Sequence, residues 1–136
     1  MASIYRTFIV DAAPEFVWDA IRDVGAVHER LAHAFVTDTQ LEGSTRTVTF
    51  ANGLVAREQI VAIDDENRRL VYSIVGGRTA HHNAFFQVFP APGGNTEILW
   101  VTDLLPDEMR EPIGQMVELG CAAMKRTLET NFAAAR

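Results

Sequence analysis

Hydrophobic and polar residues follow three different spacings along the chain. Residues 3–10 are rich in β-branched and aromatic side chains, which is typical of a strand. Between residues 35 and 105 the hydrophobic side chains recur with a period of two, as in strands that bury one face. After residue 108 they recur at the spacing of a helix. The pattern therefore predicts a first strand, a long β region and a closing helix.

Turn-forming residues divide the β region into six strands. Asn52-Gly53 favours a tight hairpin, since both positions tolerate a positive φ. A run of consecutive strands followed by a helix predicts an antiparallel sheet with its helices on one face. The expected turns lie at residues 42–44, 51–53, 64–67, 76–77 and 90–95.

Three helices are expected outside the β region. Pro14 fits the first turn of a helix over residues 14–23, which Gly25 ends. A second short helix is expected over residues 26–34. The closing helix, over residues 108–133, would be roughly 39 Å long at 1.5 Å per residue, enough to cross a sheet. Its apolar stripe consists of Met109, Ile113, Met116, Val117, Met124 and Leu128.

The order of elements predicts an α+β fold in a single domain spanning residues 1–136. This order is strand, two helices, six strands and a long helix. A chain of this length can bury one core with room for a modest cavity. Its 48% hydrophobic and 22% charged residues are typical of a soluble globular protein.

Charge and composition exclude several kinds of partner. The formal net charge is −6 and the twelve Lys and Arg residues are scattered, which argues against nucleic-acid binding. No apolar run approaches the length of about 18 residues that a membrane span needs. Arg6 lies within the N-terminal apolar run, which therefore does not resemble a signal peptide, and a cytoplasmic location is expected. The sequence leaves a monomer and a homodimer equally open.

Alternation along the strands predicts which side chains face the closing helix. With each turn at the centre of its hairpin, Phe86 lies opposite Leu99 and His82 opposite Asp103, while Glu58 falls on the other, wetter face. A one-residue bulge would reverse the faces beyond it. The expected inner face carries Phe50, Val55, Val61, Ile63, Leu70, Tyr72, Ile74, Ala84, Phe86, Val88, Leu99 and Val101, together with the polar residues Arg46, Arg57, Gln59, His82 and Asp103.

His82 and Asp103 are the candidate catalytic residues. A carboxylate can orient an imidazole and raise its pKa for general acid or base work, as an aldol cyclisation or a dehydration would require. The alternative is a cross-strand hydrogen bond with only a structural role. His81 and His82 are adjacent on a strand and point to opposite faces, so they cannot hold one metal ion together, and no metal or cofactor is expected.

Several segments resemble a known family over essentially the whole chain. They are Asp11-Ala-Ala-Pro14-Glu-Phe-Val17-Trp18 after the first strand, the Asp23-Val-Gly25 end of the first helix, the Gly93-Gly94…Trp100 strand and the closing helix. With these segments the chain resembles the START-like, birch-pollen-allergen-like (SRPBCC) superfamily, and within it the polyketide cyclase/dehydrase-like group. The resemblance implies a helix-grip fold, in which a strongly bent seven-stranded antiparallel sheet encloses a cavity under the C-terminal helix. It also implies binding of hydrophobic ligands such as lipids, sterols or polyketides.

Three functions remain open from the sequence. They are binding of a small hydrophobic molecule, which we favour, a polyketide cyclase or dehydratase that uses His82 and Asp103, and an interaction module with a filled interior. A drug-sized ligand would need a cavity of about 300 Å³ or more. The residues expected to bind the ligand are Phe50, Arg57, Gln59, Tyr72, Ile74, Phe86, Leu99, Val101, Met116 and Met124.

Overall fold

The computed structural model describes residues 2–136, which form one seven-stranded antiparallel sheet and the helices packed on it. The strands are β1 (Ala2–Val10), β2 (Val36–Glu42), β3 (Thr45–Phe50), β4 (Val55–Asp64), β5 (Arg69–Val75), β6 (His81–Ala91) and β7 (Asn95–Leu105). The helices are α1 (Pro14–Arg22), the short π-helix η1 (Val27–Leu31), the 3₁₀ turns η2 (Pro92–Gly94) and η3 (Asp107–Met109), and the long α2 (Arg110–Ala135).

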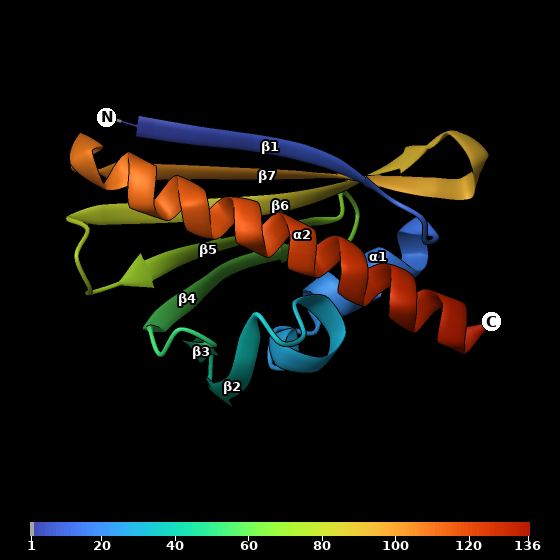
Figure 1. Ribbon diagram of the computed structural model, residues 1–136, viewed down its shortest axis with the longest axis horizontal. Coiled ribbons are helices and arrows are strands. Elements are labelled where there is room, and N and C mark those ends of the chain that lie inside the picture. The colour runs from blue at the N-terminus through green and yellow to red at the C-terminus, as the bar shows by residue number, and fades with distance from the viewer. Residues whose placement is uncertain (1) are drawn as a thin grey trace.

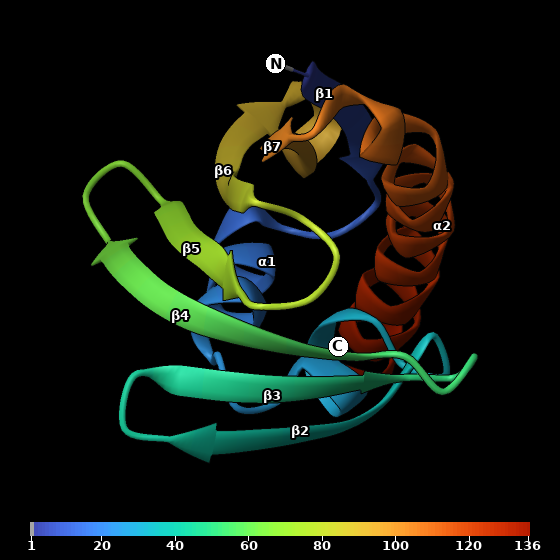
Figure 2. The ribbon, with the colours of Figure 1, turned by 90° about the vertical axis from the view of Figure 1, so that its left-hand side faces the viewer.

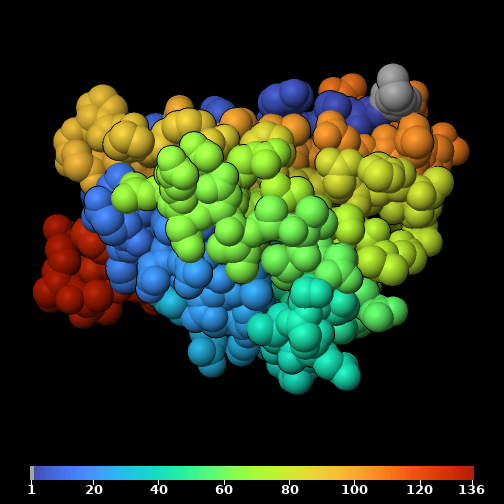
Figure 3. Space-filling view, turned by 180° about the vertical axis from the view of Figure 1, so that it is seen from behind, coloured from blue at the N-terminus to red at the C-terminus, as the bar shows by residue number. Residues whose placement is uncertain are grey.

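The sheet bends around α2. Its strand order is β1-β7-β6-β5-β4-β3-β2, so β1 and β2 form the two edges. α2 runs along the open side of the bent sheet, and α1 and η1 occupy one end of the concave side (Figure 1, Figure 2). Seen from behind, strands β4 to β6 form much of the surface, and the C-terminal end of α2 projects beyond them (Figure 3). The predicted α+β fold, with a curved antiparallel sheet around a long C-terminal helix, is confirmed.

Local sequence explains where the helices begin and end. Pro14 begins α1, where its missing N–H costs no hydrogen bond, and Arg22 in the last turn suits the negative end of the helix dipole. η1 is shorter than the helix expected over residues 26–34, because only one turn forms there. α2 has 26 residues and is therefore about 39 Å long. Within residues 2–136 no helix has the length and hydropathy that a membrane crossing requires.

The hairpin of β6 and β7 differs from the predicted register by one residue. Its connection is the three-residue turn Pro92–Gly94, in which both glycines adopt a positive φ, +77° and +78°. As a result Phe86 pairs with Trp100 and not with Leu99. Neighbouring residues of a strand point to opposite faces, so Trp100 faces α2. The predicted inward orientation of Leu99 and Val101 is therefore wrong.

A β-bulge reverses the faces of most of β4. Between Ile60 and Ala62 the pairing with β5 shifts by one residue, which leaves Val61 as the extra residue. Glu58, expected on the outer face, therefore points into the interior and is only 7% exposed. The predicted inward orientation of Val55, Arg57 and Gln59 is correspondingly wrong.

The core lies between the concave side of the sheet and the helices. The prediction for β5 and β6 is confirmed, since their inward side chains Leu70, Tyr72, Ala84, Phe86 and Val88 are buried. On α2 the predicted stripe is buried at Val117, Met124 and Leu128, whereas Met116 is only half-buried. The other buried positions of α2 are all small residues, namely Gly120, Ala123 and Thr127. Small side chains let the helix approach the sheet closely.

Gly120 brings α2 into contact with Trp100 of β7. A Cβ atom at this position would lie 3.0 Å and 3.1 Å from two atoms of the Trp100 indole. Such an approach leaves no room for a methyl group unless the ring moves. Gly114, in the same helix, is different, because its nearest neighbour is the end of the Ile4 side chain at 3.9 Å. Of the two glycines of α2, Gly120 is therefore the one that the packing requires.

Alanine at these two glycines is expected to have opposite effects on stability. Gly114→Ala gains helix propensity and should raise the free energy of unfolding by up to about 1 kcal/mol. Gly120→Ala gains the same propensity but must displace the Trp100 indole, which costs about 1–3 kcal/mol, so the net change should be a loss. Urea unfolding of both variants measures the difference. Equal stabilisation by both substitutions would show that Trp100 does not limit the approach of α2.

Candidate functional site

A cavity lies in the interior between the sheet, η1 and α2. Its volume is about 70 Å³. Most of its lining side chains are apolar or aromatic, and the charged groups are confined to one ion pair. The lining residues are Val27, Leu31, Ala32, Phe35, Val36, Arg46, Val48, Phe50, Glu58, Tyr72, Phe86, Trp100, Gly120 and Met124.

The polar part of the cavity is a buried ion pair. Arg46 of β3 and Glu58 of β4 are cross-strand partners, and Nε of Arg46 donates a hydrogen bond to Oε1 of Glu58 at 2.7 Å. Their side chains are 3% and 9% exposed. Nη1 of Arg46 also donates to the carbonyl of Val24 at 3.4 Å, and the guanidinium lies 5.1 Å from the centre of the Tyr72 ring. Removal of either charge would leave the other one buried without a partner, at a cost of about 3–5 kcal/mol.

Three aromatic side chains form a stacked layer across β5, β6 and β7. The rings of Tyr72 and Phe86 lie 6.0 Å apart between centroids, and those of Phe86 and Trp100 lie 4.7 Å apart. Nε1 of Trp100 donates a hydrogen bond to the hydroxyl oxygen of Tyr72 at 3.2 Å. Stacking and this hydrogen bond fix the three rings relative to one another, so they form an ordered aromatic wall.

The Tyr72 hydroxyl is protonated at neutral pH and can act as a donor. Burial raises the pKa of Tyr72 far above its ordinary value of 10.0, and the nearby Glu58 carboxylate raises it further. The hydroxyl oxygen accepts the Trp100 hydrogen bond, and no acceptor for its own proton lies among residues 2–136. This proton is therefore available to a molecule in the cavity.

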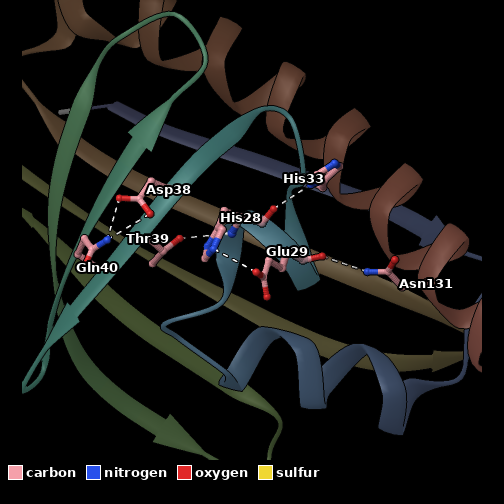
Figure 4. A network of polar contacts seen from close by, with 7 residues as sticks. All are labelled: His28, Glu29, His33, Asp38, Thr39, Gln40 and Asn131. Carbon is pink, nitrogen blue, oxygen red and sulfur yellow. Dashed lines mark hydrogen bonds and ion pairs between the residues drawn. The ribbon is translucent and has the colours of Figure 1, made fainter.

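η1 forms another wall of the cavity and is tied to its neighbours by hydrogen bonds. The backbone N–H of His28 donates to Oγ1 of Thr39 in β2 at 3.3 Å, and Nδ2 of Asn131 in α2 donates to the carbonyl of Glu29 at 3.1 Å (Figure 4). These bonds join η1 to an edge strand on one side and to the covering helix on the other. A movement of α2 away from the sheet would therefore also act on this wall.

Four of the ten predicted ligand-binding residues line the cavity. They are Phe50, Tyr72, Phe86 and Met124. Ile74 faces inward opposite Glu58 but is not part of the lining. Met116 is half-buried on α2, and its Sδ atom accepts a hydrogen bond from Nδ2 of Asn52 at 3.7 Å. A role for these residues in ligand binding stays a prediction.

The remaining four predicted residues lie on the convex face of the sheet, away from the cavity. Arg57 and Gln59 point outward because of the bulge in β4, and the amide of Gln59 donates to Oγ of Ser44 at 2.7 Å. Leu99 and Val101 point outward because of the three-residue turn before β7. Side chains on this face cannot reach the interior cavity.

The predicted pairing of His82 with Asp103 is also wrong. His82 faces inward opposite Leu104, whereas Asp103 lies opposite Asn83 on the convex face. There the Asp103 carboxylate accepts hydrogen bonds from Oγ of Ser3 at 2.6 Å and from Nδ2 of Asn83 at 3.2 Å. In the described part of the chain no carboxylate lies within ion-pair distance of His82. The acid–base pair on which a catalytic role rested is therefore not formed.

The cavity is much smaller than the resemblance led us to expect. Its 70 Å³ falls well short of the roughly 300 Å³ that a drug-sized ligand needs. Bulky side chains account for the difference, since the edge-to-face pair Phe35 and Phe50 and the indole of Trp100 all extend into the interior. Residues 2–136 contain no group of three His, Cys, Asp or Glu side chains that could hold a metal ion.

A larger groove lies outside the interior, between β1 and the first turns of α2. Its volume is about 600 Å³, and most of its lining side chains are charged. Arg6 and Glu118 form an ion pair within it. The groove is open to water, which weakens its polar contacts. We therefore assign the candidate site to the interior cavity, which combines an apolar lining with a few buried polar groups.

Sequence reasoning missed Glu58 and Trp100 as parts of the site. A signal for Glu58 was present, because Arg46 was expected on the inner face and a buried guanidinium needs a carboxylate partner. Glu58 is the acidic residue nearest to Arg46 across the hairpin, and turning it inward requires the shift of one residue that the structure contains. Trp100 had no such signal, since its orientation depends on the length of one turn.

The bent sheet, its strand order and the long covering helix define the helix-grip fold of START and birch-pollen-allergen-like proteins. The protein XoxI from Bacillus cereus has a TM-score of 0.82 with this chain at 20% identity, over 98% of this chain and 96% of that one. A START superfamily protein from Mycobacterium smegmatis gives 0.75 at 12% identity, over 98% and 99%. A point mutant of norcoclaurine synthase from Thalictrum flavum, in complex with a transition-state analogue, gives 0.71 at 16% identity, over 96% and 95%. At these identities the likeness establishes the fold alone.

The chain belongs to the family described as polyketide cyclase / dehydrase and lipid transport, which it matches over residues 1–135. The resemblance read from the sequence is thereby confirmed. No curated protein matches the chain. Family and fold together support binding of a hydrophobic ligand as the general function.

Acid is expected to destabilise the fold through His82. Burial, and then the charge of the neighbouring His81, lowers the pKa of His82 from 6.5 to about 4. In the unfolded chain the imidazole keeps its ordinary pKa, so between about pH 6.5 and pH 4 the unfolded state binds more protons than the folded state. Stability is therefore lost as the pH falls through this window, at up to about 1.4 kcal/mol per pH unit.

Urea unfolding at several pH values isolates this contribution. His82→Gln removes the titrating group, so its free energy of unfolding should fall less between pH 6.5 and pH 4 than that of the wild type. His33→Gln changes an exposed imidazole and should follow the wild type. The same pH dependence in His82→Gln and wild type would contradict the assignment.

Proposed function

We propose that this protein binds a small hydrophobic molecule in the cavity between its sheet and α2. The observation that carries the proposal is the composition of the cavity lining, which is apolar and aromatic except for the Arg46–Glu58 pair and the Tyr72 hydroxyl. A concave apolar surface with a few placed polar groups is the usual makeup of a small-molecule site. The family description, which names polyketide and lipid chemistry, supports a lipid-, polyketide- or sterol-like ligand.

A ligand larger than about 70 Å³ requires the cavity to expand. Each strand is hydrogen-bonded to its neighbours in the sheet, so the walls formed by the helices are the ones that can move more readily. Met124 on α2 has a flexible thioether that can change rotamer. η1 is a single π-turn, an element that is common at functional sites and that has few internal hydrogen bonds. We propose that the ligand displaces these two walls when it binds.

Binding is favoured over catalysis within this proposal. A cyclase or dehydratase needs a positioned acid or base, and the His82–Asp103 pair that suggested one is absent. In the cavity itself the Glu58 carboxylate is already engaged by Arg46.

We also propose that the protein acts in the cytoplasm, as a monomer or homodimer and without nucleic acid, in keeping with its net charge of −6.

Thermal unfolding in the presence of 2-ethylnaphthalene tests the proposal. A ligand that binds only the folded state stabilises it, so the probe should raise the unfolding midpoint of the wild type. Met124→Ala enlarges the cavity and should respond more strongly, although the substitution itself costs about 2–5 kcal/mol. Met116→Ala removes the same side chain from a position on α2 that does not line the cavity, and it should respond like the wild type.

No response in either the wild type or Met124→Ala would reject the cavity as a binding site. An equal response in Met124→Ala and Met116→Ala would place the probe elsewhere on the protein. Native mass spectrometry of the protein purified from its own cells would then give the mass of any retained molecule and so identify the natural ligand.

A further inference from the structure

The charges inside the cavity already neutralise each other. Arg46 and Glu58 are the charged residues of the lining, and they are joined by a hydrogen bond of 2.7 Å with both side chains buried. A positively charged site for an anion is therefore not present. A ligand carboxylate placed here would be a third buried charge, close to the carboxylate of Glu58, and an unpaired buried charge is strongly unfavourable.

Two hydrogen-bond donors of the cavity lining have no acceptor within the described residues, the uncharged Tyr72 hydroxyl and one nitrogen of the Arg46 guanidinium. The Tyr72 hydroxyl accepts from Trp100, and in residues 2–136 its own proton has no acceptor. Of the Arg46 nitrogens, Nε donates to Glu58 and Nη1 to the Val24 carbonyl, whereas Nη2 has no hydrogen-bond partner in the same part of the chain. Both residues line the cavity, and a pair of donors suits an oxygen that accepts two hydrogen bonds, which a carbonyl oxygen does.

We propose that the cavity selects neutral molecules with a carbonyl oxygen, such as ketones, over carboxylates of the same shape. This inference rests on the proposed function, because it assigns a chemical class to the ligand of the same cavity. The carbonyl oxygen accepts from the Tyr72 hydroxyl, and the apolar body of the ligand lies against the aromatic wall that Tyr72, Phe86 and Trp100 form.

Three probes with the same naphthalene body separate the contributions of the carbonyl oxygen, the carboxylate charge and the apolar contact to binding. 2-Acetylnaphthalene carries the ketone, 2-naphthoate carries a carboxylate of nearly the same shape, and 2-ethylnaphthalene carries no oxygen. Affinities are measured at pH 8 by titration calorimetry or fluorescence. We expect the wild type to bind the ketone at least about 10-fold more tightly than the carboxylate, because the carboxylate brings an unpaired charge into the interior.

The two tyrosines of the chain provide a matched pair of variants. Tyr72→Phe removes only the donating hydroxyl and should weaken the ketone about 5- to 10-fold, with little change for 2-ethylnaphthalene. Tyr5→Phe makes the same change at a side chain that is 64% exposed on β1, and it should leave all three affinities unchanged. Comparison of each probe between variants cancels the differences in its hydration.

Glu58→Gln tests the electrostatic half of the proposal. It leaves the Arg46 charge unpaired, so the affinity for 2-naphthoate should rise by about 10-fold or more relative to the ketone. If this variant fails to fold, the ratio of ketone to carboxylate affinity in the wild type and the effect of Tyr72→Phe still decide the question.

The outcomes distinguish this inference from the proposed function. Binding of 2-ethylnaphthalene without a preference for the ketone over the carboxylate, or without a loss of ketone affinity in Tyr72→Phe, overturns the inference and leaves the proposed function standing. Failure of all three probes to bind the wild type and Met124→Ala overturns both.

Discussion

A charge buried in a protein must have a partner, and in this molecule the buried guanidinium of Arg46 requires a carboxylate in the interior. Glu58 meets it from the neighbouring strand, which is possible only because the bulge at Val61 turns that carboxylate inward. With the pair formed, the guanidinium lies over Tyr72, whose ring continues into the stacked aromatic layer. The inward orientation of Glu58 in β4 and the polar part of the cavity thus both serve one electrostatic need.

The elements of the fold could be predicted because their signals are local. The start of α1 at Pro14 depends on the conformation that this residue allows, and it is found where expected. The turn at Asn52-Gly53 lies at the expected place, but it is longer than the predicted two-residue hairpin and only Gly53 adopts a positive φ. The faces of β5 and β6 were also correct, since the turn at residues 76–77 sets their register without a bulge. The family resemblance added the bend of the sheet, which periodicity alone does not specify.

The site was predicted less completely, because it depends on irregularities of a single residue. An alternating strand that gains or loses one residue exchanges its two faces, and this happened in both β4 and β7. Arg57, Gln59, Leu99 and Val101 were misplaced for this reason, and so was the partnership of His82 with Asp103. The volume of the cavity could not be predicted from the sequence for another reason. It is the small space left between large side chains, so it depends on how each of them packs.

The turn that joins β6 to β7 has a consequence for how this chain can vary over time. Because three residues close the hairpin, Trp100 faces the helix. An insertion or deletion of one residue there would present Leu99 to the helix, whereas a change of two would restore the original orientation. Length changes of two residues in this hairpin should therefore be tolerated better than changes of one. The loop is exposed, yet whether it contains an odd or an even number of residues should be constrained as strictly as a buried side chain.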